Sequence, residues 1–494
     1  MSPARPAAVV VLAAGEGTRM KSSIPKVLHA IGGRSLVGHA VKAAEALDPE
    51  HLVVVVGHGR DQVTAHLAET APRARTAVQE DQRGTGHAVQ CALRELPELT
   101  GTVVVTYGDV PLLTGETLHT LVASHEKHGN GVTVLTARVP APAGYGRVLR
   151  DADGTVTAIV EDKDATPLQR EVDEINSGIY AFDAAVLRAG LDRLTTDNSQ
   201  GELYLTDVLG LTRETGRRVG AVSTQDAVQT EGVNDRVQLA RLHGELNRRT
   251  VEAWMRAGVT MLDPDTTWVD VDVTIEADVT IEPNVLLRGS TRIEREALVG
   301  PNCLLVDTVV GANATVADTT SHGARIGPEA TVGPYTYLRP GTVLGRAAKA
   351  GGFVEMKAAV VGDGSKVPHL SYVGDADIGV GVNIGAATVF VNYDGVDKHR
   401  TVIGDHARVG SDTMLVAPVH IGDGAYTAAG SVITSDVPAG AMAVARGKQR
   451  NVEGWVERRR AGSPAAQASA RARGAGNEKA EQEQSFDDQE GPSS

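Results

Sequence analysis

The second half of the chain carries an aliphatic residue at every sixth position. An α-helix repeats near 3.6 residues and a β-strand near 2, so this period fits neither as a continuous element. It predicts short strands separated by turns and stacked into a parallel β-helix, with the aliphatic residues pointing inward. We expect glycines at corners that side chains would strain. The repeat comprises Ile275, Ile281, Leu287, Ile293, Val299, Leu305, Ile326, Val332, Leu338, Leu344, Val361, Val367, Val373, Ile403, Val409, Leu415, Ile421, Thr427 and Ile433.

The repeat is interrupted in two places. Residues 345–359 do not keep strict phase, and residues 390–401, FVNYDGVDKHRT, read as a polar insertion. Insertions in a solenoid become loops on one face, which is often the functional face. His369 lies between the two interruptions. A histidine there is usually an ordinary turn or surface residue, but polar neighbours one or two coils away favour a functional role: Tyr372, Asn383, Asn392 and Tyr393.

Composition bounds the class of protein. The chain has 494 residues, which predicts two or three domains. Aromatic residues make up only 3%, as expected for thin coils packed with Val, Ile and Ala. A net charge of −14 argues against nucleic acid as the main partner. The only cysteines, Cys91 and Cys303, predict neither a disulfide framework nor a zinc site and favour a reducing cytoplasm.

The N-terminal segment has two interpretations. Arg5 precedes the apolar run 7–14, which resembles a short signal peptide. A glycine-rich loop, GEGTRM at 15–20, follows the run directly, so we interpret the run as a buried first strand. No stretch is long and apolar enough to span a membrane, and we expect no membrane insertion.

The first half has the pattern of a parallel α/β sheet. Glycine-rich loops at 15–20 and 79–88 offer backbone N–H groups to phosphates, although either loop alone is also an ordinary turn. Asp109 ends a strand at the edge where such sheets bind ligands. A carboxylate there suits Mg²⁺, but it is equally suited to capping the next helix. The predicted buried strands are residues 7–14, 52–56 and 102–110.

These features resemble the sugar nucleotidyltransferases. The motifs occur in order and at suitable spacing: LAAGEGTRM, Pro25-Lys26, GTGHA, YGDVPLL, YGRV, VEDKDA, NSGIY and EGVN. Joined to the six-residue repeats, they are similar, as far as about residue 455, to the bifunctional N-acetylglucosamine-1-phosphate uridyltransferase and glucosamine-1-phosphate N-acetyltransferase family. The resemblance implies α/β plus all-β architecture: a Rossmann-like nucleotidyltransferase domain, a helical linker, a left-handed parallel β-helix of hexapeptide repeats and a disordered tail.

The expected boundaries follow from the pattern. We assign 1–236 to the uridyltransferase domain, 237–257 to a helical linker, 258–460 to the β-helix acetyltransferase domain and 461–494 to the tail. The linker has apolar residues at helical spacing, which also fits an amphipathic partner-binding helix. The tail is small, polar and charged, so it cannot bury enough apolar surface to order itself.

The resemblance implies uridylyl transfer from UTP to N-acetylglucosamine 1-phosphate, with release of pyrophosphate. Positioning and charge neutralisation carry such chemistry without a protein nucleophile. Asp109 and Asn234 are the implied Mg²⁺ ligands, and Arg19 and Lys26 would offset charge on the leaving pyrophosphate. The implied nucleotide and sugar contacts are Leu12, Ala13, Ala14, Gly15, Lys26, Gln79, Gly84, Thr85, Tyr107, Gly108, Asp109, Gly146, Glu161, Asn176 and Asn234.

The second implied reaction transfers acetyl from acetyl-CoA to the amine of glucosamine 1-phosphate. The amine must lose a proton to attack, and a histidine suits the base role, for which we choose His369. Two local departures from the family, Pro368 and Ala387, lie outside the assigned roles. The implied sugar-phosphate contacts are Arg339, Lys357, Tyr372 and Asn383. The implied acetyl-CoA contacts are Ala386, Asn392, Tyr393, Ser411, Ala429 and Arg446.

Two other classes of protein remain open. One is a nucleotidyltransferase whose β-helix is only an oligomerisation scaffold, and the other is a non-enzymatic β-helix module on a degenerate domain. The length of the repeat and the cluster at His369 argue against the first, and intact Lys26 and Asp109 argue against the second. The family also implies a cytoplasmic homotrimer whose product feeds peptidoglycan and, in some bacteria, lipopolysaccharide synthesis.

Overall fold

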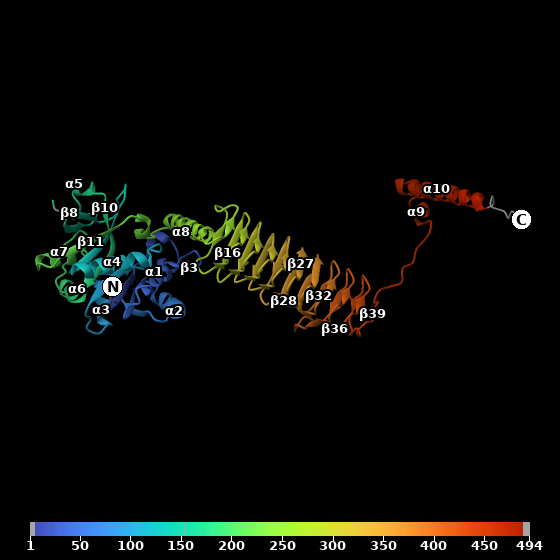
Figure 1. Ribbon diagram of the computed structural model, residues 1–494, viewed down its shortest axis with the longest axis horizontal. Coiled ribbons are helices and arrows are strands. Elements are labelled where there is room, and N and C mark those ends of the chain that lie inside the picture. Colours follow the sequence, from blue (N-terminus) through green and yellow to red (C-terminus); the bar gives the residue numbers. More distant parts are fainter. Residues whose placement is uncertain (1–4, 153, 488–494) are drawn as a thin grey trace.

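The computed structural model of the protein describes residues 5–152 and 154–487. An α/β domain occupies one end, a long β-helix extends from it, and a separate pair of helices follows an extended segment at the other end (Figure 1). This architecture confirms the fold class expected from the sequence, an α/β domain joined to an all-β domain of stacked short strands.

The α/β domain is built on one mixed sheet. Its strands run in the order β11-β7-β10-β6-β1-β4-β5, with β8 and β9 attached beside β10. The three strands expected from apolar runs are neighbours, because β1 pairs in parallel with both β4 and β6. The bounds are β1 Ala8–Ala13, β4 His51–Val56, β5 Arg75–Val78, β6 Thr102–Tyr107, β7 Val132–Arg138, β8 Arg147–Arg150, β9 Val156–Val160, β10 Glu174–Asp183 and β11 Val219–Thr224.

Helices cover both faces of this sheet. Successive residues of a strand point to opposite faces, so Val9 and Val10 of β1 belong to two different hydrophobic cores. Helices α1, α2 and α4 pack on the Val9 side, and α3, α6 and α7 pack on the Val10 side. Their bounds are α1 Leu36–Glu45, α2 Arg60–Thr70, α3 Thr85–Arg94, α4 Gly115–His128, α5 Pro167–Arg170, α6 Ala184–Leu191 and α7 Asp207–Glu214.

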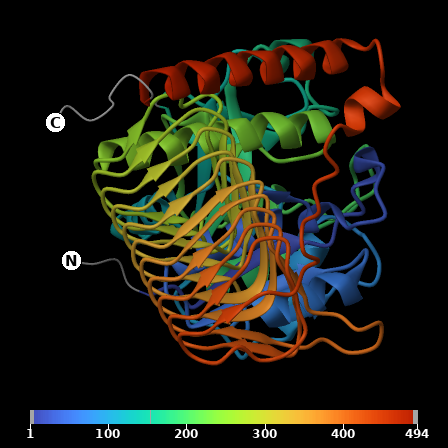
Figure 2. The ribbon, with the colours of Figure 1, turned by 90° about the vertical axis from the view of Figure 1, so that its right-hand side faces the viewer.

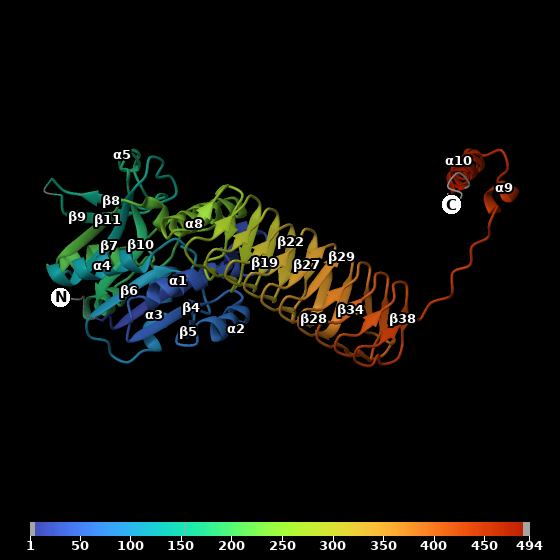
Figure 3. The same ribbon diagram turned by 45° about the vertical axis from the view of Figure 1, so that its right-hand side comes forward.

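Helix α8, Arg236–Arg256, joins the two domains (Figure 3). Asn247 on α8 is 8% exposed and bonds to the first coil, donating to the Thr267 carbonyl (2.8 Å) and accepting from Val269 N–H (2.9 Å). A hairpin of the α/β domain, β2 Ala30–Ile31 and β3 Arg34–Ser35, meets the same coil, where Val271 N–H donates to Gly32. The linker is therefore packed against both domains.

The β-helix has three faces. Most strands pair in parallel with the strand three places further on, so three strands make one coil, and the step falls to two where a long strand spans two faces. The first face contains β12 Thr260–Met261, β15 Thr280–Ile281, β18 Leu298–Val299, β21 Thr315–Val316, β24 Thr331–Val332, β27 Lys349–Gly352, β29 Lys366–His369, β31 Asn383–Ile384, β34 Arg408–Val409, β37 Tyr426–Thr427 and β39 Met442–Ala443.

The other two faces share one sheet, because two long strands bend around the corner between them. The second face contains β13 Trp268–Val269, β16 Val285–Arg288, β19 Cys303–Val306, β22 Thr319–His322, β25 Thr336–Leu338, β28 Glu355–Val361, β30 Tyr372–Ile378, β32 Val389–Val391, β35 Met414–Val416 and β38 Val432–Ile433. The third contains β14 Thr274–Ile275, β17 Arg292–Ile293, β20 Val309–Val310, β23 Arg325–Ile326, β26 Val343–Leu344, β33 Thr401–Ile403, β36 Val419–Ile421 and the ends of β28 and β30.

All the residues of the predicted repeat lie inside this stack and are 5% exposed or less. Residues 345–359 do not interrupt the coil: Ala350 and Met356 are buried at the inward positions, and the coil continues through β27 and β28. The phase shifts by one residue only after Met356, where the next inward residue is Val361. The insertion at 390–401 is confirmed, because the inward positions Phe390 and Ile403 flank a loop that projects from the stack (Figure 2).

The corners differ from expectation in one respect. Many corner residues with positive φ are not glycine; examples are Asn284 (60°), Asn302 (53°), Tyr335 (56°) and Phe353 (57°). Asn and Asp tolerate this conformation because their short side chains bond locally, but an aromatic residue there is strained. The repeat therefore imposes the corner conformation on side chains of several kinds.

The segment after residue 460 also differs from the expected disorder. Helix α9, Trp455–Arg459, is followed by α10, Pro464–Asp487, and the pair lies away from the stack (Figure 1). The segment is rich in Ala, Gln, Glu and Arg, which have high helix propensity, so local preference forms a helix without a core. Residues 488–494 of the predicted tail lie outside the described residues. No helix within 5–152 and 154–487 has the length and apolarity needed to cross a membrane.

Strand β33 offers a direct test of the inward column. Ile403 is 1% exposed, whereas its neighbour Val402 is 40% exposed on the outer side. We expect Ile403→Ala to destabilise the β-helix by about 2–5 kcal/mol, because it leaves a cavity. The matched Val402→Ala should cost under about 0.5 kcal/mol. Calorimetry of the β-helix transition measures both, and equal losses would contradict the inward assignment.

Candidate active sites

A cleft lies at the carboxyl ends of β1 and β6. Its empty volume, including the open solvent at its mouth, is about 750 Å³. Ten of the predicted nucleotide contacts line it: Leu12, Ala13, Ala14, Gly15, Lys26, Gln79, Gly84, Thr85, Tyr107 and Asp109. Four further lining residues were not predicted: Val27, Gln82, Ala88 and Glu202. Gln82 belongs to the glycine-rich loop 79–88, whose amide side chains are the signal that could have found it.

The glycine-rich loops are held close to the strands. Gln82 Nε2 donates to the Ala14 carbonyl (2.8 Å), and Gln79 Nε2 donates to the Gly84 carbonyl (3.1 Å). Gly84 has φ +99°, and a Cβ there would lie 2.7 Å from the Leu203 carbonyl oxygen. A side chain at this position would force the loop and the Leu203 segment apart. Gly108 does not line the cleft, but a Cβ on it would lie 3.0 Å from Ala13 Cβ.

The predicted metal ligands lie beside each other. The Asp109 carbonyl accepts from Val233 N–H (2.9 Å), which brings Asn234 against the end of β6. Asp109 Oδ2 pairs with the Lys26 ammonium, and Asn234 Oδ1 accepts from Arg19 (2.8 Å). One carboxylate and one amide oxygen suit a hard divalent cation that takes its other ligands from phosphates and water. The described residues contain no cluster of three or more His, Cys, Asp or Glu side chains placed to bind a metal.

The predicted sugar contacts form a second group beside the cleft. A Cβ on Gly146 would lie 3.2 Å from Ile159 Cγ2, which is a tight contact, and at ordinary contact distance from Asn176 Cβ (3.4 Å) and Glu161 Oε1 (3.5 Å). Asn176 Oδ1 accepts from Gly178 N–H (2.9 Å) and from the Tyr180 hydroxyl (2.9 Å), which orients the amide. The structure therefore brings Gly146, Glu161 and Asn176 together.

Burial raises the pKa values of two side chains at this site, those of Glu161 and Tyr107. It raises the pKa of Glu161, and the nearby carboxylates of Asp164 and Asp207 raise it further. Burial, with Glu161 and Asp109 nearby, also raises the pKa of Tyr107. The Tyr107 hydroxyl thus stays neutral at physiological pH and can donate a hydrogen bond.

A cluster of charged and polar side chains covers the second face of the β-helix. Arg339 pairs with Glu355 (2.9 Å), and Lys357 pairs with Asp375 (3.4 Å). Asn392 from the insertion donates to Asp375 (2.5 Å) and lies 3.5 Å from the Tyr372 hydroxyl. Asp375 was not predicted, although it connects two residues that were. It follows Tyr372 by three positions on β30, a spacing that carries no specific signal.

The remaining predicted residues follow one corner of the stack, between the first and second faces. Backbone hydrogen bonds run along this corner from coil to coil: Leu370 N–H to Gly352 (2.9 Å), Ala387 to His369 (3.3 Å), Asp412 to Ala386 (2.7 Å) and Gly430 to Ser411 (2.9 Å). Ala429 precedes Gly430, and a Cβ on Gly430 would lie 4.0 Å from Arg446 Cδ. This corner ladder places His369, Ala386, Ser411, Ala429 and Arg446 in a line.

Two predicted residues lie apart from the cluster. Asn383 is on β31 of the first face, beside Lys366 and Arg408 in the neighbouring coils. Tyr393 is 56% exposed on the insertion and donates to the Gly395 carbonyl (2.6 Å). His369 is exposed, and its imidazole makes no hydrogen bond to any part of the chain that the structure describes. The second site is an open surface in one chain.

Comparison with known proteins agrees with this division. The model of the MobA-like NTP transferase domain matches residues 9–173, and that of the bacterial transferase hexapeptide matches residues 400–435. The fold and the two groups of side chains define a nucleotidyltransferase joined to a hexapeptide acyltransferase.

Curated relatives match nearly the whole chain. "Bifunctional protein GlmU" of Streptomyces coelicolor is 61% identical over 95% of this chain and 98% of its own length. The proteins of the same name from Thermobifida fusca and Corynebacterium efficiens are 62% and 57% identical, over 96% and 94% of this chain and 99% and 96% of their own lengths. The chain belongs to the GlmU family of bifunctional enzymes, and the family and the pair of activities expected from its motifs are confirmed. Membership also implies a divalent metal for the nucleotidyltransferase.

The raised pKa of Glu161 has a consequence for stability. Because the folded chain holds this proton more tightly than the unfolded chain, the free energy of unfolding falls as pH rises from the unfolded pKa through the folded one. Glu161→Gln should therefore raise Tm at neutral pH, and the gain should vanish below about pH 4, where the unfolded carboxyl is protonated too. Glu69→Gln, on the exposed side of α2, is the control, and calorimetry at both pH values is the measurement. A gain equal at both would contradict the burial argument.

Proposed function

We propose that the cleft of the α/β domain transfers a uridylyl group from UTP to N-acetylglucosamine 1-phosphate, releasing pyrophosphate. The observation that carries the proposal is the convergence of two glycine-rich loops, Lys26 and Asp109 on one cleft. We assign this reaction to residues 1–236, with 237–257 as the linker. Gln79, Gly84 and Thr85 contact the uracil, and Glu161 and Asn176 contact the sugar beside it.

The reaction proceeds by in-line displacement. An oxygen of the sugar phosphate attacks the α-phosphorus, the bond to the β-phosphate oxygen breaks, and pyrophosphate leaves. Lys26 and Arg19 place positive charge where the leaving group gains negative charge. Asp109 and Asn234 would hold Mg²⁺, which neutralises phosphate charge when bound. The pairing of these four side chains supports the assignment, because phosphates and a cation can replace each partner.

We propose that the β-helix, residues 258–460, transfers acetyl from acetyl-CoA to glucosamine 1-phosphate. The amine attacks the thioester carbonyl carbon, His369 takes the proton that the nitrogen loses, and the C–S bond breaks to release the CoA thiolate, which takes up that proton from His369. Arg339 and Lys357 bind the sugar phosphate, with Tyr372 and Asn383 around the sugar. The corner ladder supports the acetyl-CoA assignment, because it extends from His369 along coils that carry Ala386, Asn392, Tyr393, Ser411, Ala429 and Arg446.

We propose further that the protein acts as a homotrimer in the cytoplasm. Both cysteines are free thiols, as in a reducing compartment. Tyr335, Phe353 and Leu370 follow one another on the corner ladder and are 61%, 62% and 60% exposed, and the first two rings stack at 5.1 Å. Such an apolar edge beside an open site supports burial against another copy, which would complete the walls of the acetyl site.

The two-site proposal is tested with two single variants of the full chain. His369→Ala removes the base, so CoA release from acetyl-CoA and glucosamine 1-phosphate should fall by about 10²–10⁴-fold while pyrophosphate release is unchanged. Asp109→Ala should do the reverse. Both assays use one preparation of each variant. A wild type that releases pyrophosphate but never CoA would leave the β-helix as a scaffold.

The trimer is tested by light scattering of the purified chain during size exclusion. We expect three times the chain mass for the wild type and a smaller species for Phe353→Asp, which puts a charge into the apolar edge. Leu168→Asp, on α5 of the other domain and 76% exposed, is the matched control and should remain trimeric. The smaller Phe353→Asp species should also lose acetyl transfer. A wild type of single chain mass contradicts the proposal.

A further inference from the structure

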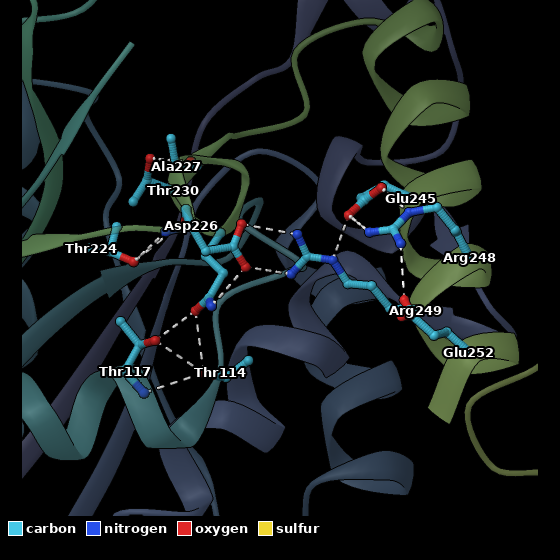
Figure 4. A network of polar contacts seen from close by, with 11 residues as sticks. Thr114, Thr117, Thr224, Asp226, Ala227, Thr230, Glu245, Arg248, Arg249 and Glu252 are labelled. Atoms are coloured by element: carbon cyan, nitrogen blue, oxygen red, sulfur yellow. Dashed lines mark hydrogen bonds and ion pairs between the residues drawn. The ribbon is translucent and has the colours of Figure 1, made fainter. Parts of the chain in front are cut away.

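An ion pair connects the linker helix to the α/β domain behind the uridylyl site. Arg249 of α8 binds Asp226 through its two terminal guanidinium nitrogens, Nη1 at 2.7 Å and Nη2 at 3.0 Å (Figure 4). Its Nε donates to Glu245 one turn earlier (2.6 Å), which fixes the plane of the guanidinium. A bidentate pair restricts orientation as well as distance, so it holds Asp226 in one place relative to the helix.

Asp226 in turn joins the two chain segments that carry the metal-binding oxygens. It precedes η3, Ala227–Thr230, which leads directly into the loop 231–235. Gln229 Nε2 donates to Asp226 (3.0 Å), and Gln229 Oε1 accepts from the hydroxyls of Thr117 (2.6 Å) and Thr114 (3.2 Å). Thr114 caps the start of α4, in the segment that follows Asp109.

Helix α8 also holds the far end of this loop. The side-chain oxygen of Gln238, in its first turn, accepts from Asn234 N–H (2.7 Å). The segment is therefore attached to the helix at both ends. Gln238 binds Asn234 at one end, and Arg249 binds Asp226, which precedes η3, at the other. Its middle is attached to β6, where Val233 N–H donates to the Asp109 carbonyl.

The helix itself is fixed to the β-helix next to Arg249. Asn247, two residues earlier, makes its two buried hydrogen bonds to the first coil, and Val251, two residues later, is 2% exposed and belongs to the β-helix core. Arg249 thus projects from the part of α8 that is least free to move. The ion pair that Arg249 makes therefore fixes the position of Asp226 relative to the β-helix.

From this arrangement we propose that Arg249, acting through Asp226, is a positioning residue for uridylyl transfer. The pair holds the loop 231–235 between α8 and the end of β6, so that the oxygens of Asn234 and Asp109 face one cation together. Neither Arg249 nor Asp226 touches the reacting groups. The inference rests on the proposed metal role of Asn234 and Asp109. Partners that orient metal ligands typically change metal affinity or activity by about 10–100-fold when they are removed.

The test uses the full chain with Arg249→Met, which keeps the aliphatic stem and removes the pair. Arg248→Met is the matched control, because within the described part of the chain Arg248 pairs only with Glu245 and Glu252 on its own helix (Figure 4). In the metal-free protein, we expect Arg249→Met to speed hydrogen exchange in 226–235 while Arg248→Met does not. With Mn²⁺ as probe, followed by its electron paramagnetic resonance signal in the presence of UTP, the dissociation constant should rise by about 10-fold for Arg249→Met alone.

Activity assays complete the test. The Mg²⁺ concentration for half-maximal pyrophosphate release should rise in Arg249→Met and Asp226→Asn, and the double variant should be no worse than the worse single one, since both remove one interaction. Arg249→Lys, which keeps the charge but not the bidentate geometry, should lie between them and the wild type. CoA release should be unchanged in all.

The outcomes separate the inference from the proposed function. If Arg249→Met matches Arg248→Met in exchange and in Mn²⁺ binding, the positioning role is wrong. If Arg249→Met and Asp226→Asn lose both activities together, the pair only stabilises the fold and the inference is overturned. If the wild type releases no pyrophosphate at any Mg²⁺ concentration, the uridylyl assignment fails, while hydrogen exchange still decides whether the pair holds the loop.

Discussion

The inward column of aliphatic side chains sets the position of everything on the surface of the β-helix. Parallel register places equivalent residues of successive coils side by side, as Gly352 and His369 are, or Lys357 and Gly374. A residue next to an inward position must point outward, so Arg339 and Lys357, which follow buried Leu338 and Met356, project from the second face. A slip of one residue in register would turn both cations into the core, where no partner could compensate the cost of burying their charges.

The residue beside Lys357 in the next coil is Gly374, and its lack of a side chain leaves room on this face for polar groups. Gly374 follows inward Val373, and a Cβ on it would lie 2.5 Å from the Tyr372 hydroxyl and 2.6 Å from Asn392 Nδ2. Any side chain would displace the tyrosine and the amide that lie over the cluster. The α/β domain uses the same device, since Gly84 allows the Leu203 segment to approach closely. In both domains a small residue beside a strand end or coil provides the space that larger polar groups fill.

Sequence patterns predicted what depends on local periodicity. The buried strands, the inward column and the insertion at 390–401 follow from apolar spacing, and the resemblance supplied Lys26 and Asp109 at the cleft. Residues 345–359 continue the coil more regularly than the sequence suggested, because Ala350 occupies an inward position without being a large aliphatic. Asp375 and Asp226 were missed, because their importance comes from partners 17 to 23 residues away, such as Asn392 and Arg249. The terminal helix was missed because weak tertiary packing was taken to mean disorder.

Charge pairing explains how an acidic chain presents cations to phosphorylated ligands. Lys26, Arg339 and Lys357 each pair with a carboxylate, from Asp109, Glu355 and Asp375 respectively. A partly buried cation without a partner would cost desolvation energy. The ion pairs reduce this cost when no ligand is bound. With the roles proposed above, a phosphate that enters would replace the carboxylate as the partner of the cation, and the released carboxylate would need a proton, a metal ion or water. Asp109 would then turn toward the proposed cation, whereas Asp375 keeps the Asn392 amide as a donor. The same exchange of partners would therefore involve a metal ion in one domain and only a hydrogen-bond donor in the other.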